Sequence, residues 1–145
     1  MTADPLLPAY PVVVTQQVLW GDMDAHGHVN NVVYYRYMED ARVACYEAID
    51  NYGFEQASGT LLVLAANACR YRRSLTYPDT VRIGARFAEF GDTRARMTFA
   101  IASTALDCIV AEGEATIACI ERATGRKTAF PDELRRRIEA LQAAR

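Results

Sequence analysis

One long stretch with helical periodicity precedes several stretches with the periodicity of β-strands, and this order limits the folds that the chain can adopt. Between about Asn31 and Ile49, apolar side chains recur every three or four residues, which predicts an amphipathic helix. Its apolar side carries tyrosines and many small residues: Tyr34, Tyr37, Met38, Ala41, Ala44, Cys45, Ala48 and Ile49. Its charged side carries Arg36, Glu39, Asp40, Arg42 and Glu47. A side with so many small residues predicts close packing against a flat surface.

Five other stretches have the character of β-strands and can supply that surface. They are residues 12–20, 62–75, 81–87, 95–101 and 109–119. The last three alternate apolar and polar residues, and Gly91-Asp92 and Leu106-Asp107 lie between them where tight turns are needed, so they predict an antiparallel meander. Residues 51–60 are expected to form a turn-rich link. The expected fold class is α+β, with a curved, antiparallel, five-stranded sheet wrapped around the long helix.

The two ends of the chain are expected to differ in structure. Met1 to Pro11 contains three prolines and predicts an unstructured, flexible lead-in. Pro131-Asp132-Glu133 predicts the start of a short C-terminal helix, because proline suits the first helical turn. A length of 145 residues suits a single domain, residues 1–145, with one core.

Net charge, hydropathy and cysteine spacing indicate which classes of partner and which cellular location to expect. A net charge of −2 argues against a general nucleic-acid binder. No apolar run approaches the ~20 residues of a membrane span, and no signal peptide is evident, so no membrane association and a cytoplasmic location are expected. The four scattered cysteines predict free, buried thiols: Cys45, Cys69, Cys108 and Cys119.

The loop before the long helix concentrates titratable and turn-forming residues. It reads Asp22-Met23-Asp24-Ala25-His26-Gly27-His28-Val29-Asn30-Asn31 and contains both histidines of the chain. Asn30 or Asn31 suits the N-cap of the helix, because an asparagine side chain accepts from a free backbone N–H there. The remaining N–H groups and the helix dipole favour an anionic oxygen in front of the helix. With a carboxylate such as Asp24 close by as nucleophile or base, the arrangement suits acyl transfer.

The same residues also permit a purely structural interpretation of the loop. Asparagine at a helix start is most often only a cap, and Gly27 fits an ordinary turn. His26 and His28 have no third ligand nearby in the sequence, which makes a zinc site a poor prediction. The residues taken alone leave both interpretations open, and no metal site is predicted.

The loop and the residues that follow it resemble the hotdog-fold acyl thioesterases. The run from Asp22 to Asn31, followed by Val32-Val33-Tyr34-Tyr35 and Glu39-Asp40-Ala41-Arg42, is similar to the pattern D-x-D-x-x-G-H-V-N-N-x-x-Y of the 4-hydroxybenzoyl-CoA thioesterase-like family. The resemblance is strongest over residues 12–50 and extends, as strand order and the Tyr77-Pro78-Asp79 turn, over nearly the whole chain. It implies the hotdog fold and an acyl-CoA thioesterase in which coenzyme A is part of the substrate and no other cofactor is needed. Acyl-carrier protein is the alternative carrier, and a homodimer or homotetramer is implied.

The resemblance also implies roles for individual residues of the loop. Asp24 matches the nucleophile or general base, and the backbone N–H of Asn31 matches the group that binds the thioester carbonyl. In the related plant acyl-carrier-protein thioesterases, an asparagine and a histidine of this loop take part. The asparagine position is His26 here, which is a departure from that pattern, and the histidine position is His28. Both histidines are therefore secondary catalytic candidates.

Substrate contacts and alternative functions complete the prediction. Phosphates of coenzyme A need cationic side chains, and within the cluster Arg70, Arg72 and Arg73 we choose Arg72 and Arg73. Tyr34 is expected to line the acyl pocket. One alternative function is a hotdog hydratase or dehydratase, whose motifs His-Phe-Pro and Asp-x-Asn-Pro-x-His are absent from the sequence. The other is an acyl-binding module without catalysis, against which the presence of Asp24 argues. The sequence does not specify the acyl group.

Overall fold

The computed structural model describes residues 3–144, and the predicted strands and helices account for most of them. The strands are β1 (Val12–Gln17), β2 (Thr60–Tyr71), β3 (Thr80–Phe90), β4 (Arg94–Ser103) and β5 (Cys108–Glu121). The helices are α1 (Asn31–Ala48), α2 (Asn51–Ser58) and α3 (Asp132–Ala143), with a short 3-10 turn, η1 (Trp20–Asp22). None of the helices in the described part of the chain is long and apolar enough to cross a membrane.

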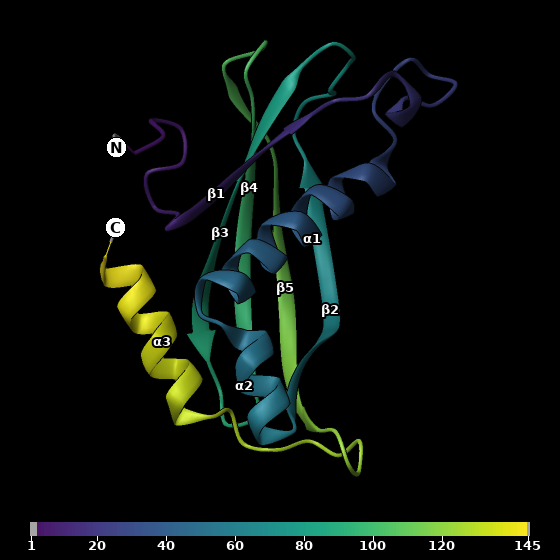
Figure 1. The fold of residues 1–145 in the computed structure, drawn as a ribbon. Helices are drawn as coiled ribbons and strands as arrows, with labels where there is room; N and C mark the ends of the chain where they lie inside the picture. Colours follow the sequence, from purple (N-terminus) through teal and green to yellow (C-terminus); the bar gives the residue numbers. More distant parts are fainter. Residues whose placement is uncertain (1–2, 145) are drawn as a thin grey trace.

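The strands form one antiparallel sheet in the order β1-β3-β4-β5-β2. Its centre is the predicted meander β3-β4-β5, and the first two strands of the chain take the opposite edges. The connection between those edges contains α1, which therefore crosses one face of the curved sheet (Figure 1). The predicted α+β class and the five-stranded sheet around a long helix are confirmed.

The apolar side of α1 packs on the sheet, mainly over β1 and β3, and forms the core. Tyr37, Met38, Ala41 and Cys45 on this side are at most 4% exposed. Gly113 on β5 permits the close approach, because a Cβ at that position would overlap the Met38 sulfur. The helix boundaries predicted from the sequence agree with α1, which ends at Ala48 with Ile49 as its C-cap.

Two residues of α1 differ from the expected pattern of burial. Arg42, expected on the charged side, is buried, and Ala48, expected on the apolar side, is exposed. Arg42 lies in the second half of α1, and α1 packs against α2, whereas Ala48 is the last residue of α1.

The helix α2 replaces the turn-rich link that the sequence predicts for residues 51–60, and that prediction is wrong. Asp50 adopts a left-handed backbone conformation (φ 49°), and its side chain accepts a hydrogen bond from the Gly53 N–H at 3.3 Å. Gly59 ends the helix in the left-handed conformation that favours glycine (φ 74°). The residues that indicated turns are thus the caps of a short helix.

The N-terminal segment, residues 3–11, packs on the face of the sheet opposite α1. Leu7 is 1% exposed and lies in a small apolar cluster with Ala100 and Ala102. The ring of Tyr10 covers Gly84, and Asp4 forms an ion pair with Arg82. Residues 3–11 contain no helix or strand, but they pack on the sheet where small side chains leave space, and the expected flexibility of the lead-in stays a prediction. Met1 and Thr2 lie outside the described residues.

Smaller differences concern strand ends and cysteines. β1 ends at Gln17 rather than Trp20, and β2 ends at Tyr71 rather than Leu75. The regular pairing stops after Tyr71 because the next two backbone N–H groups both donate to the Val110 carbonyl, at 2.8 and 3.1 Å. All four cysteines are free as expected, but Cys69 and Cys108 are only half-buried. The predicted C-terminal helix is present, but Pro131 is its N-cap rather than a residue of its first turn.

Candidate active site

The loop between η1 and α1 is a tight hairpin that its own backbone holds together. The Asp24 N–H donates to the His28 carbonyl, and the Asn30 N–H donates to the Asp22 carbonyl, each at 2.9 Å. Gly27 takes the left-handed conformation that the turn requires (φ 77°). The hairpin is also tied to the segment after β2, because the Val29 N–H donates to the Leu75 carbonyl at 2.9 Å. Asp24 therefore sits on a fixed turn in front of the helix.

The start of α1 leaves a backbone N–H group free. Asn30 is the N-cap, and its side-chain oxygen accepts from the Val32 N–H at 3.0 Å. The Asn31 N–H has no hydrogen-bond partner among residues 3–144. Together with the positive end of the helix dipole, it is suited to bind an oxygen that carries negative charge.

The Asp24 carboxylate is held by one of its oxygens. Oδ1 accepts a hydrogen bond from the His26 N–H at 2.9 Å and lies 3.7 Å from His26 Nδ1. Oδ2 has no hydrogen-bond partner within the described part of the chain. The side chain is 31% exposed, whereas that of His26 is 88% exposed. A partly exposed carboxylate with one hydrogen-bonded oxygen and one oxygen without a partner is suited to act as a nucleophile or a base.

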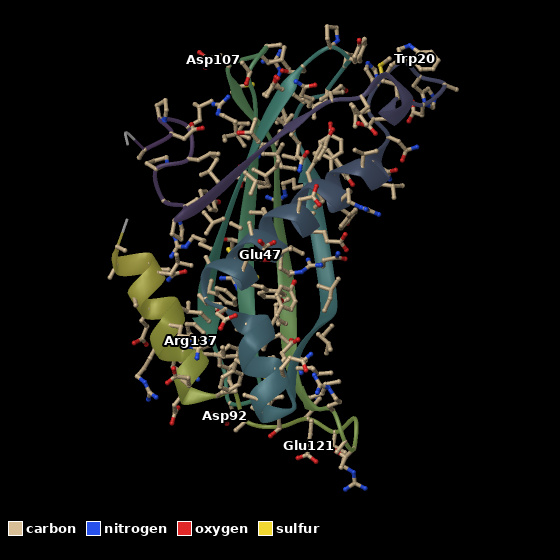
Figure 2. All side chains as sticks on the ribbon, viewed as in Figure 1. Trp20, Glu47, Asp92, Asp107, Glu121 and Arg137 are labelled. Carbon is tan, nitrogen blue, oxygen red and sulfur yellow. The ribbon has the colours of Figure 1, made fainter. Side chains whose placement is uncertain are left out.

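A cleft of about 330 Å³ opens beside this helix start. Its walls come from the hairpin, the first turn of α1 and the end of β2, and it is lined by Asp24, His26, His28, Val29, Asn31, Tyr34, Tyr71, Arg72, Arg73 and Ser74. All seven site residues predicted from the sequence line this one cleft. Trp20, labelled in Figure 2, lies at the end of the molecule where η1 leads into the hairpin, opposite the end that carries Asp92 and Glu121.

Two tyrosines from different elements meet inside the cleft. Tyr34 of α1 is 3% exposed, and burial raises the pKa of its phenol. Its ring contacts that of Tyr71 edge to face, with 4.9 Å between the ring centroids. The Tyr71 hydroxyl donates to the Asn31 carbonyl at 3.0 Å, and burial raises the pKa of this hydroxyl to about 12.

Sequence reasoning did not select three of the lining residues, Val29, Tyr71 and Ser74. Val29 lies within the loop already singled out. The one available signal for the other two was adjacency to the predicted arginines, since Tyr71 precedes Arg72 and Ser74 follows Arg73.

The two predicted arginines differ in their partners. Arg72 Nε lies 2.9 Å from Glu112 Oε1, so its charge is already paired. Arg73 has no carboxylate partner in residues 3–144, and its Nη1 lies 3.5 Å from the Cys108 sulfur. Arg73 is therefore the cleft arginine that is available to an anionic ligand.

A second, larger hollow of about 480 Å³ lies over the opposite face of the sheet. It is lined by Tyr10 and Arg70 among others, and none of the predicted catalytic residues reaches it. The carboxylate, the free helix N–H and the cationic side chains predicted for the site therefore lie in the smaller cleft. No group of three or more His, Cys, Asp or Glu side chains in the described residues is arranged to hold a metal ion.

Comparison with known families identifies the class of protein. The family model of the thioesterase-like superfamily matches residues 18–138, which include the hairpin, α1 and the whole meander. This chain belongs to the thioesterase-like superfamily. The predicted relationship to hotdog-fold thioesterases is thereby confirmed, and the chain is a thioester hydrolase by class.

Three known proteins are similar to this chain over most of its length. The long-chain acyl-CoA thioesterase FadM of Escherichia coli is 25% identical over 119 residues, which are 82% of this chain and 90% of FadM. A Thermus thermophilus thioesterase, crystallised with coenzyme A and zinc, is 30% identical with a TM-score of 0.83 over 94% of this chain and 98% of its own. The Staphylococcus aureus protein SAV2348, solved with coenzyme A, is 16% identical and has a TM-score of 0.81 over 91% of this chain and 84% of its own, which shows the shared fold.

Proposed function

We propose that this thioesterase-superfamily chain hydrolyses an acyl-CoA thioester to a free acid and coenzyme A. One observation carries the proposal: a single cleft brings together the accessible Asp24 carboxylate and the free Asn31 N–H at a helix start. Support for the acyl-CoA substrate comes from FadM and from the Thermus thermophilus thioesterase with its bound coenzyme A.

In the proposed mechanism, Asp24 acts either as the nucleophile or as the general base. Its carboxylate either attacks the carbonyl carbon or removes a proton from the water that attacks. The carbonyl oxygen gains negative charge and accepts a hydrogen bond from the Asn31 N–H at the positive end of α1. The carbon–sulfur bond then breaks, and coenzyme A leaves as a thiolate, which needs little acid assistance. Water supplies the oxygen of the free acid, directly or by hydrolysis of the acyl-aspartate.

The remaining lining residues have supporting roles in this proposal. Arg73, with Arg72 beside it, binds the phosphates of coenzyme A at the edge of the cleft. The ring of Tyr34 contacts the acyl end. His26 and His28 are both exposed, and in this proposal neither imidazole is assigned a proton transfer at the carbonyl.

We also propose that the protein forms a homodimer, or a homotetramer built from it, in the cytoplasm. β2 is an edge strand, and its residues 64–68 (Leu-Ala-Ala-Asn-Ala) are exposed and carry no charge. Such an edge pairs readily with a second strand unless it is protected. Free cysteines in all four positions fit a reducing compartment.

A thiol-release screen tests the proposed function. Acyl-CoA substrates of increasing chain length, an aromatic acyl-CoA and an acyl-carrier-protein thioester are incubated with the protein, and free thiol is measured with a chromogenic reagent. We expect release of coenzyme A with turnover from at least one acyl-CoA. A hydratase would change the acyl group and leave the thioester intact, and a binding module would retain acyl-CoA without release. Either result would refute the proposal.

A further inference from the structure

The start of α1 has more hydrogen bonds on the side of the hairpin than on the side of β2. On one side, the hairpin holds it through the hydrogen bonds of Asn30 to Asp22 and of Val29 to Leu75. The helix body then packs mainly over β1 and β3, at the other side of the sheet from β2. Toward β2, one hydrogen bond joins the first turn of α1 to the sheet within the described residues, and it comes from the Tyr71 hydroxyl.

Tyr71 is well placed to fix the position of that first turn. It is the last residue of β2 and is paired with Ala111 of β5, so its backbone is part of the sheet. Its ring is held edge to face against Tyr34 with centroids 4.9 Å apart, and its hydroxyl donates to the Asn31 carbonyl at 3.0 Å. The ring and the hydroxyl therefore contact two residues within the first turn of the same helix.

Asn31, whose carbonyl accepts this hydrogen bond, is also the residue whose backbone N–H has no hydrogen-bond partner among residues 3–144. A rigid strand is thus connected, through one side chain, to the residue proposed to bind the oxyanion. A displacement of about 1 Å in such a group can cost on the order of a hundredfold in rate, so a tether here has a catalytic consequence.

We infer that the Tyr71 hydroxyl is a positioning group that holds the Asn31 N–H in place for the thioester carbonyl. This inference rests on the proposed function. The hydroxyl acts through the helix start and does not itself exchange a proton with the substrate. It follows that its removal weakens binding of the transition state while binding of the substrate and of coenzyme A is retained.

Tyr71→Phe removes the hydroxyl and keeps the ring against Tyr34. Loss of one neutral positioning hydrogen bond is expected to lower kcat about 3- to 10-fold, with KM and the inhibition constant of coenzyme A unchanged. Tyr52→Phe is a matched control: Tyr52 is 45% exposed against 43% for Tyr71, and its ring also meets another tyrosine, Tyr46, edge to face. Because Tyr52 lies on α2 away from the cleft, its variant should keep the wild-type kcat.

Amide hydrogen exchange measures the tether without relying on turnover. In Tyr71→Phe, exchange should accelerate in the first turn of α1 and stay unchanged in β3 and β4. An unchanged kcat, or a loss that falls equally on the inhibition constant of coenzyme A, would refute the inference. So would unaltered exchange at the helix start, or faster exchange throughout the protein. A wild-type protein that released no thiol would instead refute the proposed function, and the exchange data would still decide whether Tyr71 holds the helix start.

Discussion

The two oxygens of Asp24 have different surroundings, and this difference underlies the proposed chemistry. One oxygen accepts the His26 N–H within the turn, which fixes the orientation of the carboxylate. The other has no partner in the described residues, and the Asp24 side chain lines the cleft and is 31% exposed. Because the hairpin backbone supplies the support, the orientation of Asp24 does not depend on either imidazole.

Asp24→Asn should therefore lower kcat by on the order of 10²-fold or more, the range of a positioned acid–base group. The amide cannot supply a negative charge, but it is nearly isosteric and can still accept the His26 N–H, so KM should change little. Steady-state kinetics on acyl-CoA measures both values. His26→Ala and His28→Ala serve as comparisons and should lower kcat much less than Asp24→Asn does. A near-normal kcat for Asp24→Asn, with mass spectrometry excluding deamidation back to aspartate, would contradict the proposed role.

The difference between the two cleft arginines gives a second prediction at this scale. Arg73→Glu should raise KM for acyl-CoA about tenfold or more, because a charge-assisted hydrogen bond to phosphate is replaced by repulsion. Arg72→Glu should raise it less, since Glu112 already engages the Arg72 charge. Arg70→Glu is the control, because Arg70 lines the hollow on the opposite face of the sheet. Equal KM values for the Arg73 and Arg70 variants would show that Arg73 does not contact coenzyme A.

At the scale of elements, the N-terminal segment is an additional layer on the sheet. Its contacts combine the buried Leu7 with the ion pair between Asp4 and Arg82. The hydrogen bond from the Arg82 guanidinium is the main reason why the pKa of Asp4 lies below its ordinary value of 3.8. A carboxyl with a lowered pKa in the folded state adds stability that is present above its unfolded pKa and is lost as pH falls through the folded value.

Asp4→Asn should accordingly destabilise the protein at neutral pH and have a diminishing effect below about pH 4. Urea unfolding of the wild type and of the Asp4→Asn variant, at several pH values between about 7 and 3, measures the difference between their midpoint urea concentrations. Asp92→Asn is a suitable control, because Asp92 is an exposed turn residue whose side chain accepts no hydrogen bond from residues 3–144. A gap between Asp4→Asn and wild type that stayed constant over this range would show that the ion pair does not supply the pH dependence.

Local sequence signals account for the elements that were predicted, and non-local contacts account for those that were missed. An N-cap at Asn30 or Asn31, the apolar spacing of α1 and the alternation of β3 to β5 can each be recognised from residues close together in the sequence. The burial of Leu7 depends on alanines of β4 more than ninety residues away, which proline content cannot indicate. Likewise, Tyr71 meets Asn31 across 40 positions of sequence, so its part in the site becomes visible only in the fold.

At the scale of the whole molecule, the sheet has two unequal edges. β1 is six residues long, whereas β2 is twelve residues long and exposes the uncharged segment 64–68. A long, uncharged edge next to the cleft is the feature most suited to a second copy of the chain. The proposed dimer therefore places its interface on the same side of the molecule as the candidate site.

Leu64→Lys should shift the protein from dimer toward monomer, because a charge in a paired edge strand must be buried without a partner. Light scattering at micromolar concentration measures the mass. Leu106→Lys is the matched control: Leu106 is 37% exposed, against 44% for Leu64, but lies in the turn between β4 and β5. A monomeric wild type, or equal dissociation by both variants, would contradict pairing through β2.

The placement of the chain ends has a practical consequence. Because the N-terminal segment folds back over the sheet and α3 returns beside β3, both ends emerge on the side of the molecule away from η1 and β2 (Figure 1). An affinity tag or a reporter fused to either end would therefore cover neither the cleft nor the β2 edge proposed for pairing.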